Sequence, residues 1–382
     1  MPKIIAFYLP QFHPIKENNK WWGPGFTEWH NVAKARPLFK GHHQPNLPGE
    51  LGFYDLRLPQ TREDQASLAQ EYGIDGFCYW HYWFAGQRLL ESPAAEVLRT
   101  GKPGLPFCLG WANESWTGVW HGSPNHSLME QSYPAGDAER HYALLREFFM
   151  DARYLRVHGK PVFYVYKPRL IPAESGYLAT LRRLAKEDGF PDLHIVGTWS
   201  PNPSGSFQSA AEVGLDAAVV TNITGRDSHA KSQWLFAALE KLKHKVGGKV
   251  GPTRVDYGSA IKAMLPAPSS FKFKAYNCVV SNWDNSPRSG RRATVFTDAS
   301  PALFEGALRQ ALAQADPADA SGADDGLVFL KSWNEWAEGN YVEPDQVHGR
   351  AYLEAIRRAV DDDRAGRTAR AGSPSVAAAT EG

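Results

Sequence analysis

Short apolar, β-rich segments recur along the whole chain of 382 residues, and helical patterns lie between many of them. The segments expected to be strands are residues 4–8, 76–79, 106–111, 161–166, 193–197, 217–220, 276–280 and 327–331. The clearest helical patterns cover residues 62–72, 138–153, 176–188, 232–245 and 301–315. Strands that alternate with helices favour a parallel sheet. Eight such units favour closure, so the sequence predicts an α/β fold, a single (β/α)8 TIM barrel; an open, doubly wound sheet is the structural alternative.

The connections between the expected strands differ greatly in length. Residues 10–57 and 221–274 are long and contain many Pro and Gly residues. Loops of this length in a compact domain usually have a function, and in a barrel they would cover the C-terminal mouth, where active sites lie. We therefore expect one catalytic barrel over residues 1–360, with long loops at its mouth. Residues 361–382, rich in Ala, Arg, Ser and Gly, are expected to form a disordered tail.

Charge and motifs exclude several classes of function. The formal net charge is +1, and Lys and Arg are scattered, so no nucleic-acid partner is expected. No apolar stretch is long enough to span a membrane, and the apolar run at the N-terminus is too short for a signal peptide, so the expected location is cytoplasmic. The sequence has no GxGxxG, GxxxxGK[ST], GxSxG or HExxH motif, and no cofactor is expected.

Cysteine and histidine usage gives no sign of a metal site. Cys78, Cys108 and Cys278 all lie in strand-like apolar runs and are expected to be buried free thiols. His42 and His43 are adjacent, but no Cys or carboxylate stands at ligand spacing from them. The expectation is therefore a site without a metal ion.

Tryptophan is unusually frequent, with 13 residues, and several tryptophans stand among polar residues. Trp111 and Trp116 flank Asn113 and Glu114, for example. A ring in polar company fits a wet cleft, where it can stack on a ligand while polar groups bind hydroxyls. A pyranose, with an apolar face and a hydroxylated rim, suits such a cleft. For any single ring, packing at the rim of the barrel is the alternative explanation.

Nearly every expected strand is followed by an aromatic, amide or ionisable residue. In a closed barrel these strand ends meet at one mouth, so together they favour a site for a polar ligand such as a carbohydrate. Ordinary polarity of strand ends explains single residues but not a set this aromatic. The residues expected to bind the substrate are Tyr8, Gln11, His13, Glu28, Trp29, Tyr79, His81, Trp111, Asn113, Glu114, Tyr166, Trp199, Trp283, Asn334 and Trp336.

Glu335 and Glu338 follow the last expected strand, beside Trp333 and Trp336. On a helical turn, a spacing of three residues puts both carboxylates on one face. Neighbouring carboxylates can acquire different proton affinities, so that one donates a proton while the other accepts one, as glycosidic cleavage requires. The same spacing occurs on many solvated helices, but its place at a strand exit beside tryptophans favours a catalytic pair.

Several segments resemble known families. The segment WNEWAEG at residues 333–339, followed by VEP at 342–344, resembles the signature of glycoside hydrolase family 99, whose members are endo-acting α-mannosidases and α-mannanases. The segments FYLPQFH at 7–13, GFTEW at 25–29, GIDGF at 73–77 and WANE at 111–114 resemble the WbsX-type, family-99-like proteins of bacterial polysaccharide gene clusters. This second resemblance covers about residues 1–358.

The resemblance implies a barrel fold, a metal-independent site and specific roles for the two glutamates. In family 99 the first glutamate takes the proton of the sugar's 2-hydroxyl, whose oxygen attacks the anomeric carbon to give a 1,2-anhydro sugar. The second glutamate protonates the leaving oxygen and then helps water to open the epoxide with net retention. Carried over, Glu335 is the base and Glu338 the acid/base. An internal nucleophile gains a large entropic advantage, and substrate-assisted schemes are recognised exceptions among glycosidases.

The expected function is therefore a retaining glycoside hydrolase that cleaves α-mannoside-like or α-rhamnoside-like linkages in a bacterial surface polysaccharide or oligosaccharide. WbsX-type proteins are often labelled glycosyltransferases, so a transferase of polysaccharide assembly is the first alternative. It would need a nucleotide-sugar site, but no DxD motif follows a strand; Asp361-Asp362-Asp363 lies in the expected tail. A non-catalytic carbohydrate-binding barrel is the second alternative, and it would have no need of both glutamates.

Overall fold

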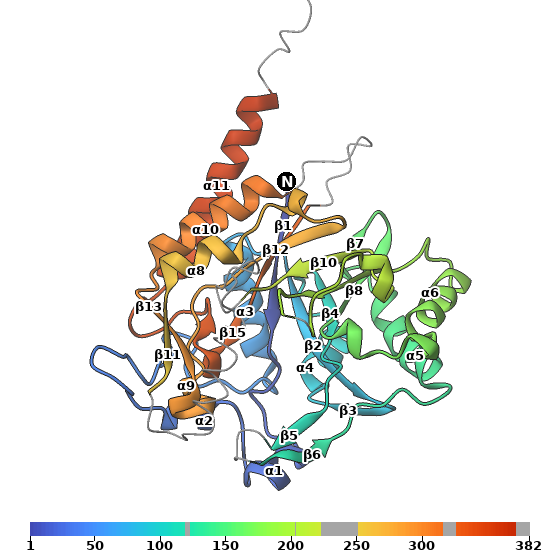
Figure 1. Ribbon diagram of the computed structural model, residues 1–382, viewed down its shortest axis with the longest axis horizontal. Coiled ribbons are helices and arrows are strands. Elements are labelled where there is room, and N and C mark those ends of the chain that lie inside the picture. Colours follow the sequence, from blue (N-terminus) through green and yellow to red (C-terminus); the bar gives the residue numbers. More distant parts are fainter. Residues whose placement is uncertain (119–122, 203, 223–250, 316–325, 372–382) are drawn as a thin grey trace, which may run out of the picture.

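Eight parallel strands close into a barrel (Figure 1). The computed structural model describes residues 1–118, 123–202, 204–222, 251–315 and 326–371. Strand β1 (Lys3–Tyr8) pairs with β2 (Gly76–Phe84) on one side and with β14 (Leu327–Leu330) on the other. The wall between them is completed by β4 (Phe107–Trp111), β8 (Lys160–Val165), β9 (His194–Trp199), β10 (Ala217–Val220) and β12 (Lys274–Val279). The predicted (β/α)8 barrel is confirmed, and the open-sheet alternative is wrong.

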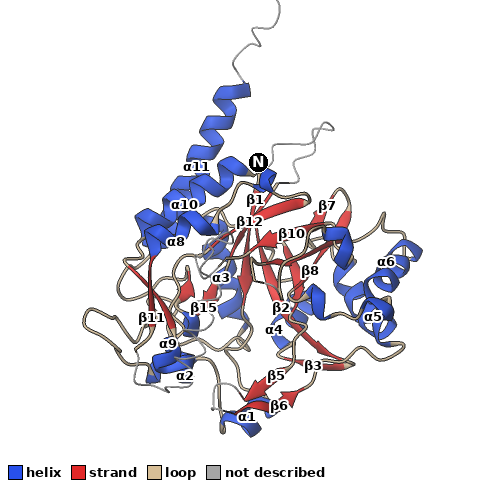
Figure 2. Cartoon of the chain, viewed as in Figure 1, coloured by secondary structure: helices blue, strands red, loops and turns tan. Residues whose placement is uncertain are grey.

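Helices surround the barrel, and Figure 2 shows them outside the central strands. Four lie close to the predicted positions: α3 (Pro59–Glu71), α5 (Asp137–Phe149), α6 (Tyr177–Glu187) and α10 (Pro301–Gln314). Sequence patterns did not indicate α4 (Ser92–Thr100) or α8 (Tyr257–Met264). The helix expected at residues 232–245 lies outside the described residues. Helix α10 begins where its sequence predicts, because Ser300 caps it by accepting a hydrogen bond from the backbone N–H of Leu303.

The last described helix differs from expectation. Residues 361–382 were expected to form a tail without regular structure, but α11 (Ala351–Ala371) continues to residue 371. The charged side chains in this stretch form ion pairs, such as Arg367 with Asp363 at 2.7 Å and Arg309 of α10 with Asp362. The Arg367 guanidinium also donates to the carbonyl of Leu312 in α10. Pairing along and between the two helices therefore orders a segment whose composition alone suggested disorder; residues 372–382 are not described.

Aromatic side chains fill the interior of the barrel. The ring of Phe7 in β1 lies 4.9 Å from that of Trp80 in β2 and 4.8 Å from that of Tyr164 in β8. Strands β1 and β8 are not neighbours in the wall, so this last contact crosses the interior. Phe329 of β14 completes the group, with its ring 5.5 Å from that of Phe7. Because side chains alternate along a strand, the positions two residues further on face the mouth above this layer.

Residues adjacent to this interior set face the surrounding helices instead. The ring of Trp111 stacks on Tyr177 of α6 with ring centroids 5.1 Å apart, and Tyr8 donates a hydrogen bond of 2.6 Å to Gln65 of α3. The three cysteines are buried free thiols, as the sequence predicted. Within the described ranges, no helix combines the length and apolarity needed to cross a bilayer.

Short elements surround the carboxyl ends of the barrel strands, near α1 and the β5–β6 hairpin in Figure 1. The short helices are α1 (Lys16–Trp22), α2 (Trp29–Lys34), α9 (Ser286–Ser289) and the 3₁₀ turn η7 (Trp336–Glu338). Other described strands are β3 (Gln87–Leu89), β5 (Trp116–Gly118), β6 (Ser123–Met129), β7 (Arg156–Val157), β11 (Thr253–Asp256), β13 (Thr294–Thr297), β15 (Asn334–Glu335) and β16 (Asn340–Tyr341). The first long loop, residues 10–57, thus contributes Gln11 and Trp22 to the mouth, as the sequence predicted, whereas residues 223–250 of the second long loop lie outside the described residues.

Candidate active site

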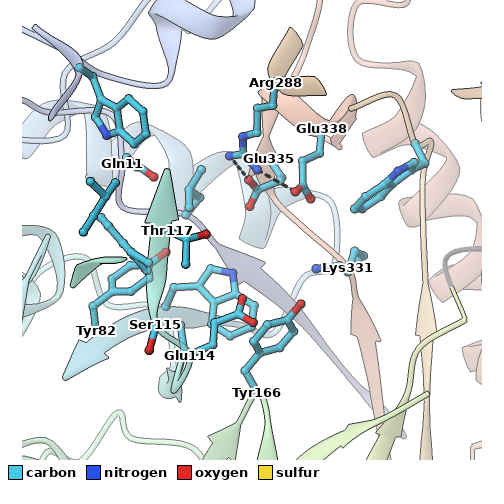
Figure 3. Close-up of a pocket in the computed structure, with 17 residues that line it drawn as sticks. Gln11, Tyr82, Glu114, Ser115, Thr117, Tyr166, Arg288, Lys331, Glu335 and Glu338 are labelled. Atoms are coloured by element: carbon cyan, nitrogen blue, oxygen red, sulfur yellow. Dashed lines mark hydrogen bonds and ion pairs between the residues drawn. The ribbon is translucent and has the colours of Figure 1, made fainter. Parts of the chain in front are cut away.

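A cavity of about 420 Å³ opens at the carboxyl ends of the strands. This volume falls within the range of about 300–1,000 Å³ that is usual for small-molecule sites. Aromatic rings and ionisable groups share its wall (Figure 3). The lining residues are Leu9, Gln11, Trp22, Trp80, Tyr82, Ala112, Glu114, Ser115, Trp116, Thr117, Leu128, Tyr166, Trp283, Arg288, Lys331, Glu335 and Glu338.

Both glutamates of the expected pair face this cavity. Glu335 ends the short strand β15, and the tight turn η7 carries Glu338. Gly339 ends the turn with a φ of +59°, and a Cβ there would lie 2.9 Å from the Cβ of Asp284. The backbone N–H of Asp284 also donates to the carbonyl of Glu338 at 2.7 Å. The chain can therefore turn sharply after Glu338 only because a residue without a side chain follows it.

One guanidinium connects the two carboxylates. Arg288 donates from Nη2 to Oε1 of Glu335 at 2.5 Å and from Nη1 to Oε1 of Glu338 at 2.7 Å. Its Nε donates to Oε2 of Glu28 at 3.2 Å. The side chains of Glu28, Glu335 and Arg288 are 0%, 6% and 7% exposed, whereas that of Glu338 is 21% exposed. The arrangement is thus a largely buried cluster of three carboxylates on one cation.

Within the described residues, the second oxygen of each catalytic candidate accepts no hydrogen bond. Arg288 binds Oε1 of both Glu335 and Glu338, and no described residue donates a hydrogen bond to their Oε2 atoms. A carboxyl group can accept a hydrogen bond on one oxygen while the other holds or receives a proton. The pair can therefore exchange protons with a bound molecule without breaking its contacts with Arg288.

Burial raises the proton affinity of the cavity carboxylates. It raises the pKa of Glu335 to about 7, and the charges of Glu338 and Glu28 add to the effect, while Arg288 and Lys331 oppose it. Burial also raises the pKa of Glu114, an effect that Lys167 opposes and the nearby charge of Glu338 reinforces. Two carboxyl groups of the cavity therefore hold protons at higher pH than free side chains do.

A buried network fixes the loop that carries the pair. Glu343 accepts hydrogen bonds from Nε1 of Trp336 and Nε2 of Gln65, both at 2.6 Å, and from the hydroxyl of Tyr54 at 2.9 Å. Asn334 bonds the backbone of Leu9 twice: its Oδ1 accepts from the N–H at 2.7 Å, and its Nδ2 donates to the carbonyl at 3.1 Å. The segment of residues 334–343, called the glutamate loop below, is therefore attached to Leu9 at the end of β1 and to Tyr54 in the mouth loop of residues 10–57.

A second contact positions the segment that carries Arg288. Nε2 of His42 lies 2.8 Å from Oδ2 of Asp284, and Gln44 donates to the same oxygen at 2.5 Å. The backbone N–H of Leu38 donates to Nδ1 of His42, so the ring proton resides on Nε2 and points to Asp284. Burial opposes ionisation of Asp284, but the bonds from His42, Ser286 and Gln44 hold its pKa below the ordinary value.

The structure brings six of the predicted site residues to the cavity: Gln11, Glu114, Tyr166, Trp283, Glu335 and Glu338. Several other predicted residues lie on the opposite face of a strand, so the structure does not bring them to this cavity. Tyr8, Tyr79, His81 and Trp111 occupy strand positions that face the helices, and His81 contacts His141 of α5 at 2.9 Å. Their alternation partners Trp80 and Tyr82 line the cavity instead.

The remaining predicted residues hold the mouth loops together and do not line the cavity. Asn113 and Asn334 bond backbone groups of neighbouring loops, and Trp336 is held by Glu343. Trp29 donates to the carbonyl of Tyr54, and Trp199 to that of Phe207. His13 is buried, and Glu28 lies behind Arg288. Amides and indoles at strand ends satisfy backbone groups as readily as they bind ligands, so residue type alone does not separate these two roles.

Sequence reasoning missed Trp22, Trp80, Tyr82, Trp116, Arg288 and Lys331. Trp80, Tyr82 and Lys331 lie on the same face of their strands as Phe7, but the sequence alone does not indicate which face that is, because both faces of the wall are buried. Nothing in the loop sequence that contains Arg288 indicates that this side chain reaches the glutamates. Among the residues that the structure describes, no group of three His, Cys, Asp or Glu side chains is placed to hold a metal ion.

Comparison with known proteins places the chain in a family. The model of the family described as glycosyltransferase WbsX matches residues 4–356. The protein WxcX of Xanthomonas campestris pv. campestris is 38% identical over 362 residues, which is 94% of this chain and 49% of WxcX. The chain thus spans about half the length of that relative.

Solved structures show the same fold at low sequence identity. The glycoside hydrolase family 99 endo-α-mannosidase from Bacteroides thetaiotaomicron is 15% identical, with a TM-score of 0.53 over 96% of this chain and 98% of that enzyme. A glycoside hydrolase-like protein is 14% identical, with a TM-score of 0.55 over 94% of this chain and 93% of that protein. By the match over nearly its whole described length, this chain belongs to the WbsX family, and it has the barrel fold of family 99 glycoside hydrolases.

Proposed function

We propose that this chain is a retaining glycoside hydrolase that cleaves α-mannoside-like or α-rhamnoside-like linkages in a bacterial surface polysaccharide or oligosaccharide. The observation that carries the proposal is the pair Glu335 and Glu338, which face one aromatic-walled cavity, each with an oxygen that accepts no hydrogen bond from a described residue. The barrel fold shared with family 99 enzymes and membership of the WbsX family support it.

The first step would form an internal ring on the sugar. Oε2 of Glu335 takes the proton of the sugar's 2-hydroxyl. The 2-oxygen of the sugar then bonds to the anomeric carbon as the glycosidic bond breaks. The leaving oxygen takes a proton from Glu338. Glu335, with a pKa near 7, is well matched to this task at neutral pH. Much of it is then the deprotonated carboxylate, and that carboxylate still binds a proton more firmly than an ordinary glutamate does.

The second step would add water. Glu338, now ionised, takes a proton from a water molecule, whose oxygen attacks the anomeric carbon and breaks its bond to the 2-oxygen. That oxygen recovers its proton from Glu335. Each step inverts the anomeric centre, so the two together retain the configuration. Arg288 lies beside both carboxylates and would stabilise whichever is ionised.

The aromatic wall supports a sugar as the ligand. Trp80, Trp283, Tyr82 and Tyr166 line the cavity beside the charged groups. Rings of this kind stack on the apolar face of a pyranose, while ionisable groups bind its hydroxyls.

A panel of α-mannan and α-rhamnan oligosaccharides tests this proposal. The wild type should release sugar from at least one of them with retained configuration, observed by NMR, and Glu338→Gln should be at least a hundredfold slower. Methylation of the 2-hydroxyl of the reacting sugar should abolish turnover, because no proton can be removed. Glu50→Gln, which removes an exposed carboxylate paired with Arg350, is the matched control and should be unchanged. Absence of turnover on every substrate would contradict the proposal.

Transfer from a nucleotide-activated sugar is the alternative function. The description of the family as glycosyltransferases favours it, as does the ammonium of Lys331 on the cavity wall, which could meet a phosphate. Nucleoside diphosphates would then raise the midpoint of thermal unfolding, because a ligand that binds only the folded state stabilises it. Strong stabilisation by these compounds, with no hydrolysis of glycans, would favour transfer.

A further inference from the structure

Arg288 has more carboxylates around it than an ordinary ion pair requires. Besides its bonds to Glu335 and Glu338, its Nη2 lies 3.1 Å from Oε2 of Glu28 and its Nε lies 3.2 Å from the same atom. Glu28 directly precedes α2, whereas Arg288 belongs to α9, so two separate mouth loops meet behind the glutamate loop. Glu28 does not line the cavity and is completely buried. A substrate in the cavity would therefore meet Arg288 and the pair, but not Glu28.

We propose that Glu28 and Arg288 are positioning residues for the glutamate pair: Glu28 holds the guanidinium from behind, and the guanidinium binds one oxygen of each glutamate and leaves the other facing the sugar. This inference rests on the proposed hydrolase function. The planar guanidinium presents its N–H groups in fixed directions, so anchoring Nε fixes where Nη1 and Nη2 point. The two bonds to Oε1 then select the rotamers of both carboxylates.

The charges of this cluster make Glu28 more than an anchor. A guanidinium next to two carboxylates alone would hold both ionised, and an acid/base catalyst needs one of them to accept and release a proton. Glu28 adds a third negative charge on the far side of Arg288 and offsets part of its effect. Oε1 of Glu28 is buried and accepts no hydrogen bond from a described residue, and Oε2 accepts, besides its contacts with Arg288, a long bond of 3.4 Å from Nδ2 of Asn31.

Other charged or titratable groups that face the pair come from four elements. Lys331 follows β14, Glu114 follows β4, Tyr82 belongs to β2 and Tyr166 follows β8. Lys331 lowers the proton affinity of Glu335 against the effect of burial, whereas Glu28 raises it in the same direction as burial. Arg288 lowers and Glu28 raises the pKa of Tyr82, but burial holds that pKa well above its ordinary value, so Tyr82 stays neutral and an altered titration reports the glutamate pair.

The two positioning residues should act on pH dependence in opposite directions. In Glu28→Gln the amide oxygen can still bind Arg288, but one negative charge is lost, so both limbs of the pH profile of kcat/KM should move down by about 1 pH unit. In Arg288→Gln the positive charge is lost, and the limbs should move up by about 1–3 pH units. Arg288→Lys keeps the positive charge but loses the planar guanidinium that binds both carboxylates. The value of kcat should therefore fall at least tenfold, with little displacement of either limb of the pH profile.

The double variant Glu28→Gln with Arg288→Gln restores the net charge of the cluster. Its limbs should return to within about half a pH unit of the wild type, whereas kcat should remain low because the carboxylates are no longer held. Glu50→Gln serves as the control for loss of an exposed carboxylate and should leave the profile unchanged. A purely structural role for Glu28 and Arg288 predicts lower activity in all variants with no opposed displacement of the limbs.

The experiment therefore has two arms. The first arm measures kcat/KM against pH for these variants on a glycan that the wild type hydrolyses. The second follows the infrared carboxyl bands of the free protein against pH, with 13C-labelled glutamate, and needs no substrate. Opposed displacements in Glu28→Gln and Arg288→Gln support the proposal. Equal or absent displacement in both arms overturns it; infrared displacement without turnover on any glycan overturns the hydrolase assignment alone. If Arg288→Gln does not fold, Glu28→Gln and the double variant decide the matter.

Discussion

Glu343 provides the sharpest test of how the glutamate loop is held. Its carboxylate is buried and accepts bonds from Trp336, Gln65 and Tyr54, all neutral donors. Among the described residues, no lysine or arginine forms an ion pair with it. Burial therefore raises its pKa to about 7, against the bonds that favour the ionised form. Glu343 should thus carry a proton in mildly acidic solution and lose it only above neutral pH.

The sign of the effect on stability follows from the proton balance. Between pH 4.5 and about 7 the folded protein keeps a proton on Glu343 that the unfolded chain has released. The free energy of unfolding must then fall as pH rises through this window. A rise in the pKa of Glu343 from 4.5 to about 7 corresponds to a contribution of roughly 3 kcal/mol to the free energy of unfolding. This contribution is present in full below pH 4.5 and is lost above pH 7.

Glu343→Gln should remove this slope. The amide is neutral at every pH, and Gln65 and the Tyr8 hydroxyl bonded to it can reorient to accept the new N–H group. Glu343→Ala should instead destabilise the protein by about 3–9 kcal/mol at pH 5, because three buried donors lose their acceptor at about 1–3 kcal/mol each. Urea unfolding at pH 5, 6, 7 and 8 measures both effects. Parallel curves of unfolding free energy against pH for wild type and Glu343→Gln would refute this reasoning.

Three further predictions concern other parts of the site. Gly339→Ala should lower the free energy of unfolding by about 1–3 kcal/mol, because its φ of +59° is strained for alanine and the new Cβ would meet Asp284; urea unfolding checks this. Trp80→Phe should weaken oligosaccharide binding about three- to tenfold in calorimetry, since stacking contributes about 0.5–1.5 kcal/mol, whereas Trp111→Phe, which faces the helices, should leave it unchanged. Burial and Arg88 lower the pKa of His81 to about 3, so stability should be lost as pH falls below 6.5, and His81→Gln should reduce that loss.

Much of the fold could be predicted because it rests on local patterns. Each of the eight barrel strands is a short apolar run, and the buried barrel wall requires such runs on both faces of the sheet. The pair Glu335 and Glu338 could be predicted for a similar reason, since both lie within one short segment at the end of the last strand. Local sequence was sufficient wherever a single segment determined the outcome.

The rest of the site depends on contacts between distant segments. Arg288 reaches Glu28, which lies 260 positions away in the sequence, and no local pattern encodes that meeting. Alternate residues of a strand point to opposite faces, so a shift of one position exchanges the residues that face the cavity. Tyr79 and His81 were therefore predicted to bind the substrate, whereas their neighbours Trp80 and Tyr82 line the wall. The ion pairs that order α11 beyond residue 360 are likewise partly between helices.

The roles of the two glutamates can be separated by varying the acidity of the leaving group. Aryl glycosides with a very acidic phenol need no proton on departure, whereas a sugar leaving group does. Glu338→Gln should therefore retain the rate of bond cleavage, seen as a burst, on the activated glycoside and lose at least a hundredfold on the oligosaccharide. Glu335→Gln should lose at least a hundredfold on both. Equal losses for Glu338→Gln on the two substrates, or full activity of Glu335→Gln on either, would contradict the assignment of Glu335 as base and Glu338 as acid on one sugar.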